Sequence, residues 1–307
     1  MDFVGSNLVP KLIEAGHEVT ALERVVTGRY GKLEEDGVEI KSVDLTDHER
    51  IGPILKDVNP DIIIHLAALS SVGYSYFAPQ EMFRVNALAS INLAEQVRLN
   101  LPNLQHYIHV STTEVLGVTH DRPAKETTTC IPNSPYSISK HSAEKFVEYL
   151  WMAHQFPMTI IRPTNCYGRV RDVNFLIERC TTQMLTGQTV KLGDPNPIRD
   201  WLYIDDKIDA YMAILNNRDK SIGEVFNIST HENHTIVDTA HIIKRLTGFV
   251  GSILWGHGTK RPLDIQDHRI NSDKIRNMLG WAPRYSLEEG LKLTIEKLRA
   301  KLQTTAT

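Results

Sequence analysis

The chain has 307 residues, of which 41% are hydrophobic and 23% are charged. This size and composition are typical of a folded protein with one large or two modest domains, and they exclude a disordered or fibrous chain. The net charge of -3 leaves no basic excess for a phosphate backbone, so we do not expect nucleic acid as the main partner.

The three cysteines, Cys130, Cys166 and Cys180, form no C-x-x-C pair, which favours free thiols in a reducing compartment. The 13 histidines are scattered without a matching set of thiolates or carboxylates, so no metal site is expected. No window approaches the roughly 18 apolar residues of a membrane span, and the N-terminus lacks the pattern of a signal peptide. These features predict a cytoplasmic protein that makes no membrane contact.

Hydrophobic periodicity predicts alternating strands and helices through the first half of the chain. Alternation of this kind is typical of an α/β protein with a Rossmann-type, doubly wound parallel sheet. The expected helices are 8–14, 49–58, 81–99 and 135–154, and the expected strands are 17–22, 38–43, 62–66, 107–110 and 159–162.

The alternation weakens after Pro163, where glycine and proline become frequent in 193–197 and 256–262. We therefore expect a first domain over residues 1–164, joined by a return segment near 195–230. Residues 165–307 are expected to form mainly a smaller C-terminal α/β domain.

The chain opens with the second half of a dinucleotide-binding pattern. Gly5 precedes a predicted helix, and a glycine there lets the backbone approach a pyrophosphate at the helix N-terminus. Asp2 stands where a second glycine is expected, so an ordinary loop before a helix is the better interpretation of this segment alone. The pattern also predicts that the first strand of the sheet and its glycine would precede Met1.

Acidic and small residues follow the next predicted strands. Glu23 ends a strand at the place where a carboxylate can accept the hydroxyls of an adenosine ribose. Arg24 beside it could instead pair with a 2′-phosphate, so NADP stays open beside NAD. The further candidates for cofactor contact are Asp44, Leu45, Leu66, Ala67 and Ala68. The small residues in this set allow a cofactor to approach closely, although tight packing alone would also explain them.

The most specific pattern lies in the middle of the chain, where VSTTEVLG at 110–117 is followed by Tyr136 and Lys140. Residues four apart share one face of a helix, and a lysine ammonium beside a phenol favours the phenolate. Tyr136 is thus a candidate acid/base near neutral pH, although an unperturbed tyrosine has a pKa of about 10. Tyr203 and Lys207 have the same spacing, but only Tyr136 begins a long helix after a strand that ends in hydroxyl residues.

Six motifs occur in order between Phe3 and Leu298: HLAA, STTEVLG, SPYSISK, RPTNCYG, GDPNPIRDWLYIDD and LGWAP. Their order and spacing resemble the NAD-dependent epimerase/dehydratases of the extended short-chain dehydrogenase/reductase family. This resemblance implies NAD as cofactor, a nucleotide sugar as substrate, and a homodimer formed through the helices near 81–99 and 135–154. Residues 1–164 would then bind the dinucleotide, and 165–307 mainly the nucleotide sugar.

The same resemblance implies roles for single residues. Thr112 would bind the 4-oxygen of the sugar, Tyr136 would be the catalytic base, and Lys140 would assist it and bind the nicotinamide ribose. Pro163 joins the residues implied to contact the cofactor. The residues implied to contact the substrate are Thr113, Asn165, Arg199 at the nucleotide diphosphate, and Arg261.

Glu114 indicates which reaction to expect. The relatives all oxidise carbon 4 first; 4-epimerases then return the hydride to the other face, whereas 4,6-dehydratases need a second base for the proton on carbon 5. Dehydratases that resemble this chain carry that base at the position of Glu114, and Thr113 is typical of the GDP-mannose type. We therefore expect a nucleotide-sugar 4,6-dehydratase, a lyase. A UDP-glucose 4-epimerase-like enzyme, a UDP-glucuronate decarboxylase and an inactive nucleotide-binding relative are the alternatives.

Overall fold

The computed structural model describes residues 3–24, 37–170, 175–257 and 261–305. The chain divides into two compact units. Unit 1 comprises Met1–Val115, Pro132–Arg162 and Tyr211–Phe226, and unit 2 comprises Leu116–Ile131, Pro163–Ala210 and Asn227–Thr307.

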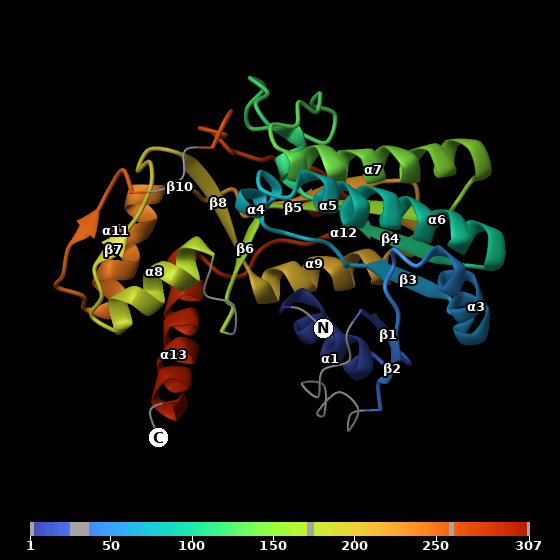
Figure 1. Cartoon of the computed structure of the whole chain (residues 1–307), viewed down its shortest axis with the longest axis horizontal. Coiled ribbons are helices and arrows are strands. Elements are labelled where there is room, and N and C mark those ends of the chain that lie inside the picture. Colours follow the sequence, from blue (N-terminus) through green and yellow to red (C-terminus); the bar gives the residue numbers. More distant parts are fainter. Residues whose placement is uncertain (1–2, 25–36, 171–174, 258–260, 306–307) are drawn as a thin grey trace. The chain divides into compact units, whose positions relative to one another are not determined.

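Unit 1 follows the predicted alternation closely, and most of its elements begin and end within three residues of the expected bounds (Figure 1). Its helices are α1 (Phe3–Glu14), α3 (His48–Val58), α4 (Val72–Ser75), α5 (Pro79–Phe83), the π-helical turn η1 (Arg84–Leu88), α6 (Ala89–Asn100), α7 (Pro135–His154) and α10 (Arg218–Ser221). Its strands are β1 (Thr20–Glu23), β2 (Glu39–Ser42), β3 (Ile62–His65) and β4 (His106–Val110). The elements η2 (Thr113–Leu116), β5 (Met158–Pro163), α9 (Ile204–Asn216) and β9 (Val225–Ile228) include residues of both units.

The main sheet has the strand order β3-β4-β5-β9, and the pairs β3–β4 and β4–β5 are parallel. In this register His65 lies beside His109, and His109 beside Ile160. Strands β1 and β2 form a separate parallel pair, and no hydrogen-bonded ladder joins them to β3 in the described part of the chain. The parallel sheet with intervening helices confirms the predicted α/β class.

One hydrophobic core joins these elements. Side chains from α3, α6 and α7 pack on β4 and β5, and Leu22 and Val43 bring the β1–β2 pair onto the same core. Helices α6 and α7 lie side by side over the sheet (Figure 1). Burial of each large apolar side chain stabilises the fold by about 1.5–3 kcal/mol, so this core fixes the two helices on the strands.

Helix α7 has the predicted bounds because both of its ends carry strong local signals. Ser134 and Ser137 form a capping box, and Pro135 occupies the first turn, where its missing N–H removes no helical hydrogen bond. The helix ends at Gln155 in the left-handed conformation, with φ of 52°. These caps place Tyr136 in the first turn of the helix.

The expected helix 81–99 is interrupted by η1, a π-helical turn between α5 and α6. Asn86 lies in this turn and is fully buried. Its side-chain oxygen accepts a 2.8 Å hydrogen bond from the backbone N–H of Leu69, and its Nδ2 donates to the Leu69 carbonyl at 3.0 Å. The turn therefore holds the loop that follows β3.

Unit 2 contains smaller and less regular sheets. Its elements are β6 (Asn165–Tyr167), α8 (Leu176–Leu185), β7 (Val190–Lys191), β8 (Ile198–Tyr203), β10 (Asn233–Thr235), α11 (Ile236–Thr247), β11 (Ile253–Leu254), α12 (Asp273–Leu279) and α13 (Leu287–Thr305). The main sheet of unit 2 has the order β10-β8-β6, parallel between β6 and β8 and antiparallel between β8 and β10. Helices α8, α11 and α13 pack on one another (Figure 1).

No helix among the described residues is both long and apolar enough to cross a membrane.

Candidate active site

Unit 1 brings three of the predicted catalytic side chains together. The phenol of Tyr136 is hydrogen-bonded to the side chain of Thr112, and the Glu114 carboxylate lies close enough to act on it electrostatically. The backbone N–H of Glu114 also donates a 3.2 Å hydrogen bond to Thr112 Oγ1. Thr112 follows β4, Glu114 lies in η2 and Tyr136 begins α7, so the carboxyl end of a parallel strand and a helix N-terminus meet here.

The pKa of Tyr136 is raised above the ordinary tyrosine value. Burial is the largest cause, because it disfavours the charged phenolate, and the Glu114 carboxylate adds to it. The hydrogen bond from Thr112 acts in the opposite direction. Without a bound ligand, the phenol is therefore protonated at neutral pH. Formation of a phenolate needs additional positive charge at the site.

Lys140 lies one turn after Tyr136 on α7 and is 2% exposed. It faces His65 and His109, where its charge adds to burial in lowering the pKa of both imidazoles, that of His65 to about 3. The two rings lie 5.6 Å apart, and His65 Nε2 is 2.9 Å from Ser90 Oγ. Both histidines are consequently neutral at neutral pH, and they do not add positive charge beside Lys140.

The predicted cofactor residues of unit 1 lie after successive strands. Glu23 ends β1, and Asp44 follows β2 and accepts hydrogen bonds from the Thr46 N–H at 2.9 Å and Oγ1 at 2.8 Å. These bonds lower the pKa of Asp44, and the charges of Arg24 and Arg84 add to the effect. A carboxylate after each strand of a parallel pair suits the hydroxyls and amino groups of an adenosine.

The loop after β3 carries Leu66, Ala67 and Ala68, and Asn86 holds its backbone at Leu69. Ala67 is exposed, so a ligand can approach the backbone there without a large side chain in the way. Leu45 packs against the core of unit 1, which also gives it a structural role. Together with Glu23 and Asp44, this loop fits a dinucleotide bound at the carboxyl ends of the strands.

Gly5 was expected in the loop before the first helix, but it lies inside that helix. Helix α1 begins at Phe3, so Gly5 lies buried in its first turn. A glycine in this place allows close packing of the helix, as the last glycine of a dinucleotide-binding pattern does. The cofactor role of Gly5 stays a prediction.

Unit 2 contains three predicted substrate residues, Asn165, Arg199 and Arg261. The Nδ2 of Asn165 is buried and makes no hydrogen bond among the described residues. The guanidinium of Arg199 donates to the Ile265 carbonyl at 2.7 Å and lies 3.4 Å from Asp264 Oδ1, so a diphosphate would share it with these partners. Arg261 is exposed.

The two remaining predicted contacts, Thr113 in unit 1 and Pro163 at the end of β5, are buried, and their roles stay predictions. The second tyrosine of the Y-x-x-x-K pattern has a different setting. Tyr203 Oη is 3.0 Å from the Lys297 ammonium on α13, and its ring packs on Tyr167 and Tyr285. These contacts give Tyr203 a structural role within unit 2.

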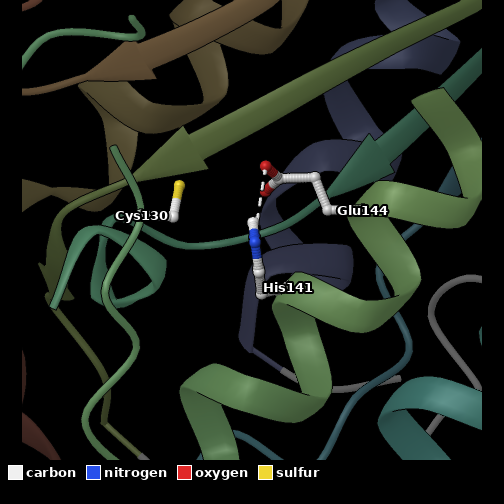
Figure 2. Close-up of side chains that lie close together, drawn as sticks. All are labelled: Cys130, His141 and Glu144. Carbon is white, nitrogen blue, oxygen red and sulfur yellow. Dashed lines mark ion pairs between the residues drawn. The ribbon is translucent and has the colours of Figure 1, made fainter. Parts of the chain in front are cut away.

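A buried polar cluster that the sequence did not predict lies next to the candidate catalytic residues. It is formed by Ser111, which precedes Thr112, Glu144 on α7, and Arg162 on β5, and all three side chains are buried. Figure 2 shows Glu144 beside His141 on the same helix, with His141 Nδ1 3.9 Å from Glu144 Oε1. One signal was available, because Glu144 lies one helical turn beyond Lys140 and shares its face.

A parallel sheet with candidate cofactor residues after its strands, and a Thr-Tyr-Lys set beside them, define a Rossmann-type enzyme. Comparison with known proteins shows to which family of Rossmann-type enzymes the chain belongs. A family model described as GDP-mannose 4,6 dehydratase matches residues 2–294, and the chain therefore belongs to this family of nucleotide-sugar epimerases and dehydratases.

Its relatives have two different activities. The chain is 29% identical to a UDP-glucose 4-epimerase of Mycolicibacterium smegmatis, covering 98% of this chain and 97% of that protein. It is 30% identical to a dTDP-glucose 4,6-dehydratase of the same organism, covering 97% and 91%.

Solved structures show the same mixture. The UDP-glucose 4-epimerase of Thermotoga maritima, solved with UDP-glucose, is 30% identical and superposes with a TM-score of 0.90, covering 98% of this chain and 96% of that chain. The dTDP-glucose 4,6-dehydratase of Bacillus anthracis, solved with NAD, is 25% identical with a TM-score of 0.85, covering 98% and 94%. These neighbours confirm the Rossmann-type fold. Because they include both an epimerase and a dehydratase, the reaction of this protein has to be inferred from the residues of its site.

Proposed function

We propose that this protein is an NAD-dependent nucleotide-sugar 4,6-dehydratase. The observation that carries the proposal is the position of Glu114, whose carboxylate lies close to the Tyr136 phenol. A dehydratase needs two bases near one sugar ring, one for the 4-hydroxyl and one for the proton on carbon 5. A 4-epimerase needs only the first, so a second carboxylate at this place favours elimination.

We propose that Glu23, Asp44, the loop 66–68 and Lys140 hold NAD. The dTDP-glucose 4,6-dehydratase of Bacillus anthracis was solved in complex with NAD, which supports this choice of cofactor. NAD supplies a hydride acceptor for carbon 4 and returns the hydride later in the reaction. Its nicotinamide is positively charged, and with Lys140 it would lower the pKa that burial and Glu114 raise at Tyr136. NADP stays the alternative, because Arg24 adjoins Glu23.

In the first step Thr112 binds the 4-oxygen of the sugar, and Tyr136 removes the 4-hydroxyl proton as hydride leaves carbon 4. The resulting ketone acidifies the proton on carbon 5. Glu114 removes that proton and gives it to the hydroxyl on carbon 6, which leaves as water. The hydride taken from carbon 4 would then be added to carbon 6 while a solvent-derived proton is delivered to carbon 5, which gives a 4-keto-6-deoxy sugar.

We propose that Asn165, Arg199, Arg261 and Thr113 contact the nucleotide sugar. The unpartnered Nδ2 of Asn165 supports this, because a buried donor without a partner is costly unless a ligand accepts its hydrogen bond. The charge of Arg199 suits a diphosphate, although Asp264 already compensates part of it.

The second candidate function is a nucleotide-sugar 4-epimerase. It is favoured by the relatives that carry this name. Only the fate of the 4-keto intermediate separates the two, since the first step is the same.

We also propose a cytoplasmic homodimer that forms through α6 and α7. Five large apolar side chains are exposed on these helices and the adjoining η1: Leu88 (57%), Leu99 (57%), Ile138 (43%), Tyr149 (48%) and Met152 (76%). Exposed apolar side chains gathered on adjacent helices are typical of protein interfaces. Sedimentation velocity tests this, and a monomer at micromolar concentration would contradict it.

A panel of nucleotide sugars, incubated with the protein and NAD and followed by mass spectrometry, tests the function. A dehydratase product is lighter by one water. An isomer of unchanged mass would establish the epimerase, and loss of carbon dioxide from a uronate would establish the decarboxylase. Conversion of no substrate would favour the inactive nucleotide-binding relative.

A further inference from the structure

Glu144 connects three elements that surround the catalytic residues. It lies on α7 and is fully buried. Its Oε2 accepts a 2.6 Å hydrogen bond from Ser111 Oγ, directly after β4. Arg162 on β5 donates from Nε to both carboxylate oxygens at 3.1 Å, and its Nη2 also donates to Oε1. One carboxylate therefore joins a helix to the ends of two neighbouring strands.

A buried ion pair is not a strong source of stability. Removal of both charges from water costs about as much as their attraction returns, and apolar residues of similar volume often stabilise a core equally well. Hydrogen bonds from Ser111 and Arg162 are directional, however, and they fix distances that apolar packing leaves adjustable. The cluster is thus better suited to positioning than to stabilisation.

The location of the cluster determines what it positions. Ser111 is covalently joined to Thr112, and Glu144 lies one turn from Lys140 on the same face of α7. The bond between Ser111 and Glu144 therefore joins the end of β4 to α7 one residue away from Thr112. The distance between these two elements decides whether Thr112 reaches the phenol of Tyr136, with which it shares a hydrogen bond.

We infer that Glu144 is a positioning residue, which holds Thr112 at hydrogen-bond distance from Tyr136 by anchoring Ser111 to α7. The inference rests on the proposed function, in which Thr112 and Tyr136 both act on the 4-hydroxyl of the sugar. Glu144 does not touch the substrate. Loss of its contact to Ser111 lets Thr112 move, and misplacement of a catalytic group by about 1 Å can cost 10²-fold in rate.

Ser111→Ala is the central test, because it removes the hydrogen bond but leaves the Glu144–Arg162 ion pair intact. We expect kcat to fall about 10- to 100-fold, while KM for the nucleotide sugar changes little. Glu144→Asp keeps the charge but shortens the side chain, so it should lower kcat at least as much. If Glu144→Asp does not fold, Ser111→Ala still decides the question.

Thr159→Val is the matched control. Thr159 lies on β5, and its buried hydroxyl donates a 2.6 Å hydrogen bond to the Ser221 carbonyl and lies 2.7 Å from His106 Nε2, away from the catalytic set. Because two buried contacts are lost, Thr159→Val should lower the melting temperature at least as much as Ser111→Ala and leave kcat unchanged. If kcat falls equally in both variants, or in neither, Glu144 has only a structural role.

A measurement without substrate separates this inference from the proposed function. With 3-fluorotyrosine at position 136, the ¹⁹F chemical shift reports the hydrogen bond from Thr112. It should change in Ser111→Ala and stay constant in Thr159→Val, whether or not the wild type converts any nucleotide sugar. An unchanged shift in Ser111→Ala would overturn the inference, while a wild type without turnover would overturn only the proposed function.

Discussion

The Glu114 carboxylate raises the pKa of the Tyr136 phenol, so these two side chains lie close together in unit 1. They come from separate elements, because Glu114 belongs to the turn after β4 and Tyr136 to the first turn of α7. Two bases near one sugar ring can remove two different protons in succession. Substitution of Tyr136 should therefore affect oxidation at carbon 4, and substitution of Glu114 should affect the loss of water.

Tyr136→Phe should abolish turnover while the fold is retained, because the ring still packs and only the ionisable group is lost. Removal of a general base typically costs 10²- to 10⁴-fold in rate, and steady-state kinetics with a converted nucleotide sugar measure it. The matched control is Tyr203→Phe, which loses only the hydrogen bond with Lys297. It should keep its activity and lose about 0.5–1.5 kcal/mol of stability. If Tyr203→Phe is the inactive variant instead, the catalytic tyrosine is wrongly assigned.

Glu114→Gln should stop the loss of water but permit oxidation at carbon 4, since the two steps use different bases. The expected sign is NADH absorbance that appears on mixing with substrate and persists without a dehydrated product. Rapid-mixing absorbance and mass spectrometry of the product measure the two steps separately. Full 4-epimerase activity in this variant would contradict the dehydratase mechanism.

The same variant should change the pH dependence of the oxidation step. Because the Glu114 carboxylate raises the pKa of Tyr136, its removal lowers that pKa and increases the phenolate fraction at a given pH. The pH profile of single-turnover NADH formation should therefore move to lower pH in Glu114→Gln. A profile that stays in place or moves to higher pH would show that Glu114 does not act on Tyr136 in the complex.

The buried imidazole of His109 should make stability depend on pH. Burial lowers its folded pKa well below 6.5, so the unfolded chain binds the proton first as the pH falls. The neutral imidazole therefore makes its full contribution to the free energy of unfolding above about pH 6.5. Below that value the free energy of unfolding falls by up to about 1.4 kcal/mol per pH unit. His109→Phe should reduce this slope in denaturant titrations between pH 6.5 and 4.5. Tyr107→Phe, on the same strand, should change the stability equally at each pH, and an unchanged slope in His109→Phe would contradict the neutral imidazole.

The predicted elements matched the structure where their signals are local. Ser134-Pro135 and the helical period define α7, and the β-branched run at 62–66 defines β3 within one residue. The sequence carries no comparable signal for the π-helical turn at Arg84–Leu88. This turn lies between two α-helical segments, so the pattern there still predicts a continuous helix. Gly5 was misplaced because Gly5, Ser6 and Asn7 were interpreted as a turn before the helix, whereas α1 begins at Phe3.

The sequence predicted that the candidate catalytic residues lie together, but it did not predict the buried polar cluster beside them. Tyr136 and Lys140 are close in sequence, and Thr112 and Glu114 occur in one short motif. Ser111 and Glu144, in contrast, are 33 residues apart, and Glu144 and Arg162 are 18 apart. Only the register of β4, β5 and α7 brings them together, and single residue types do not encode that register.

The most direct test of the dehydratase assignment is the wild-type reaction in heavy water with NAD and a converted nucleotide sugar. Elimination removes the carbon-5 proton, and a solvent-derived proton replaces it after hydride adds to carbon 6. The account predicts a product that has lost one water and carries one deuterium at carbon 5, detected by mass spectrometry and NMR. A product of unchanged mass without deuterium would contradict it and identify the protein as an epimerase.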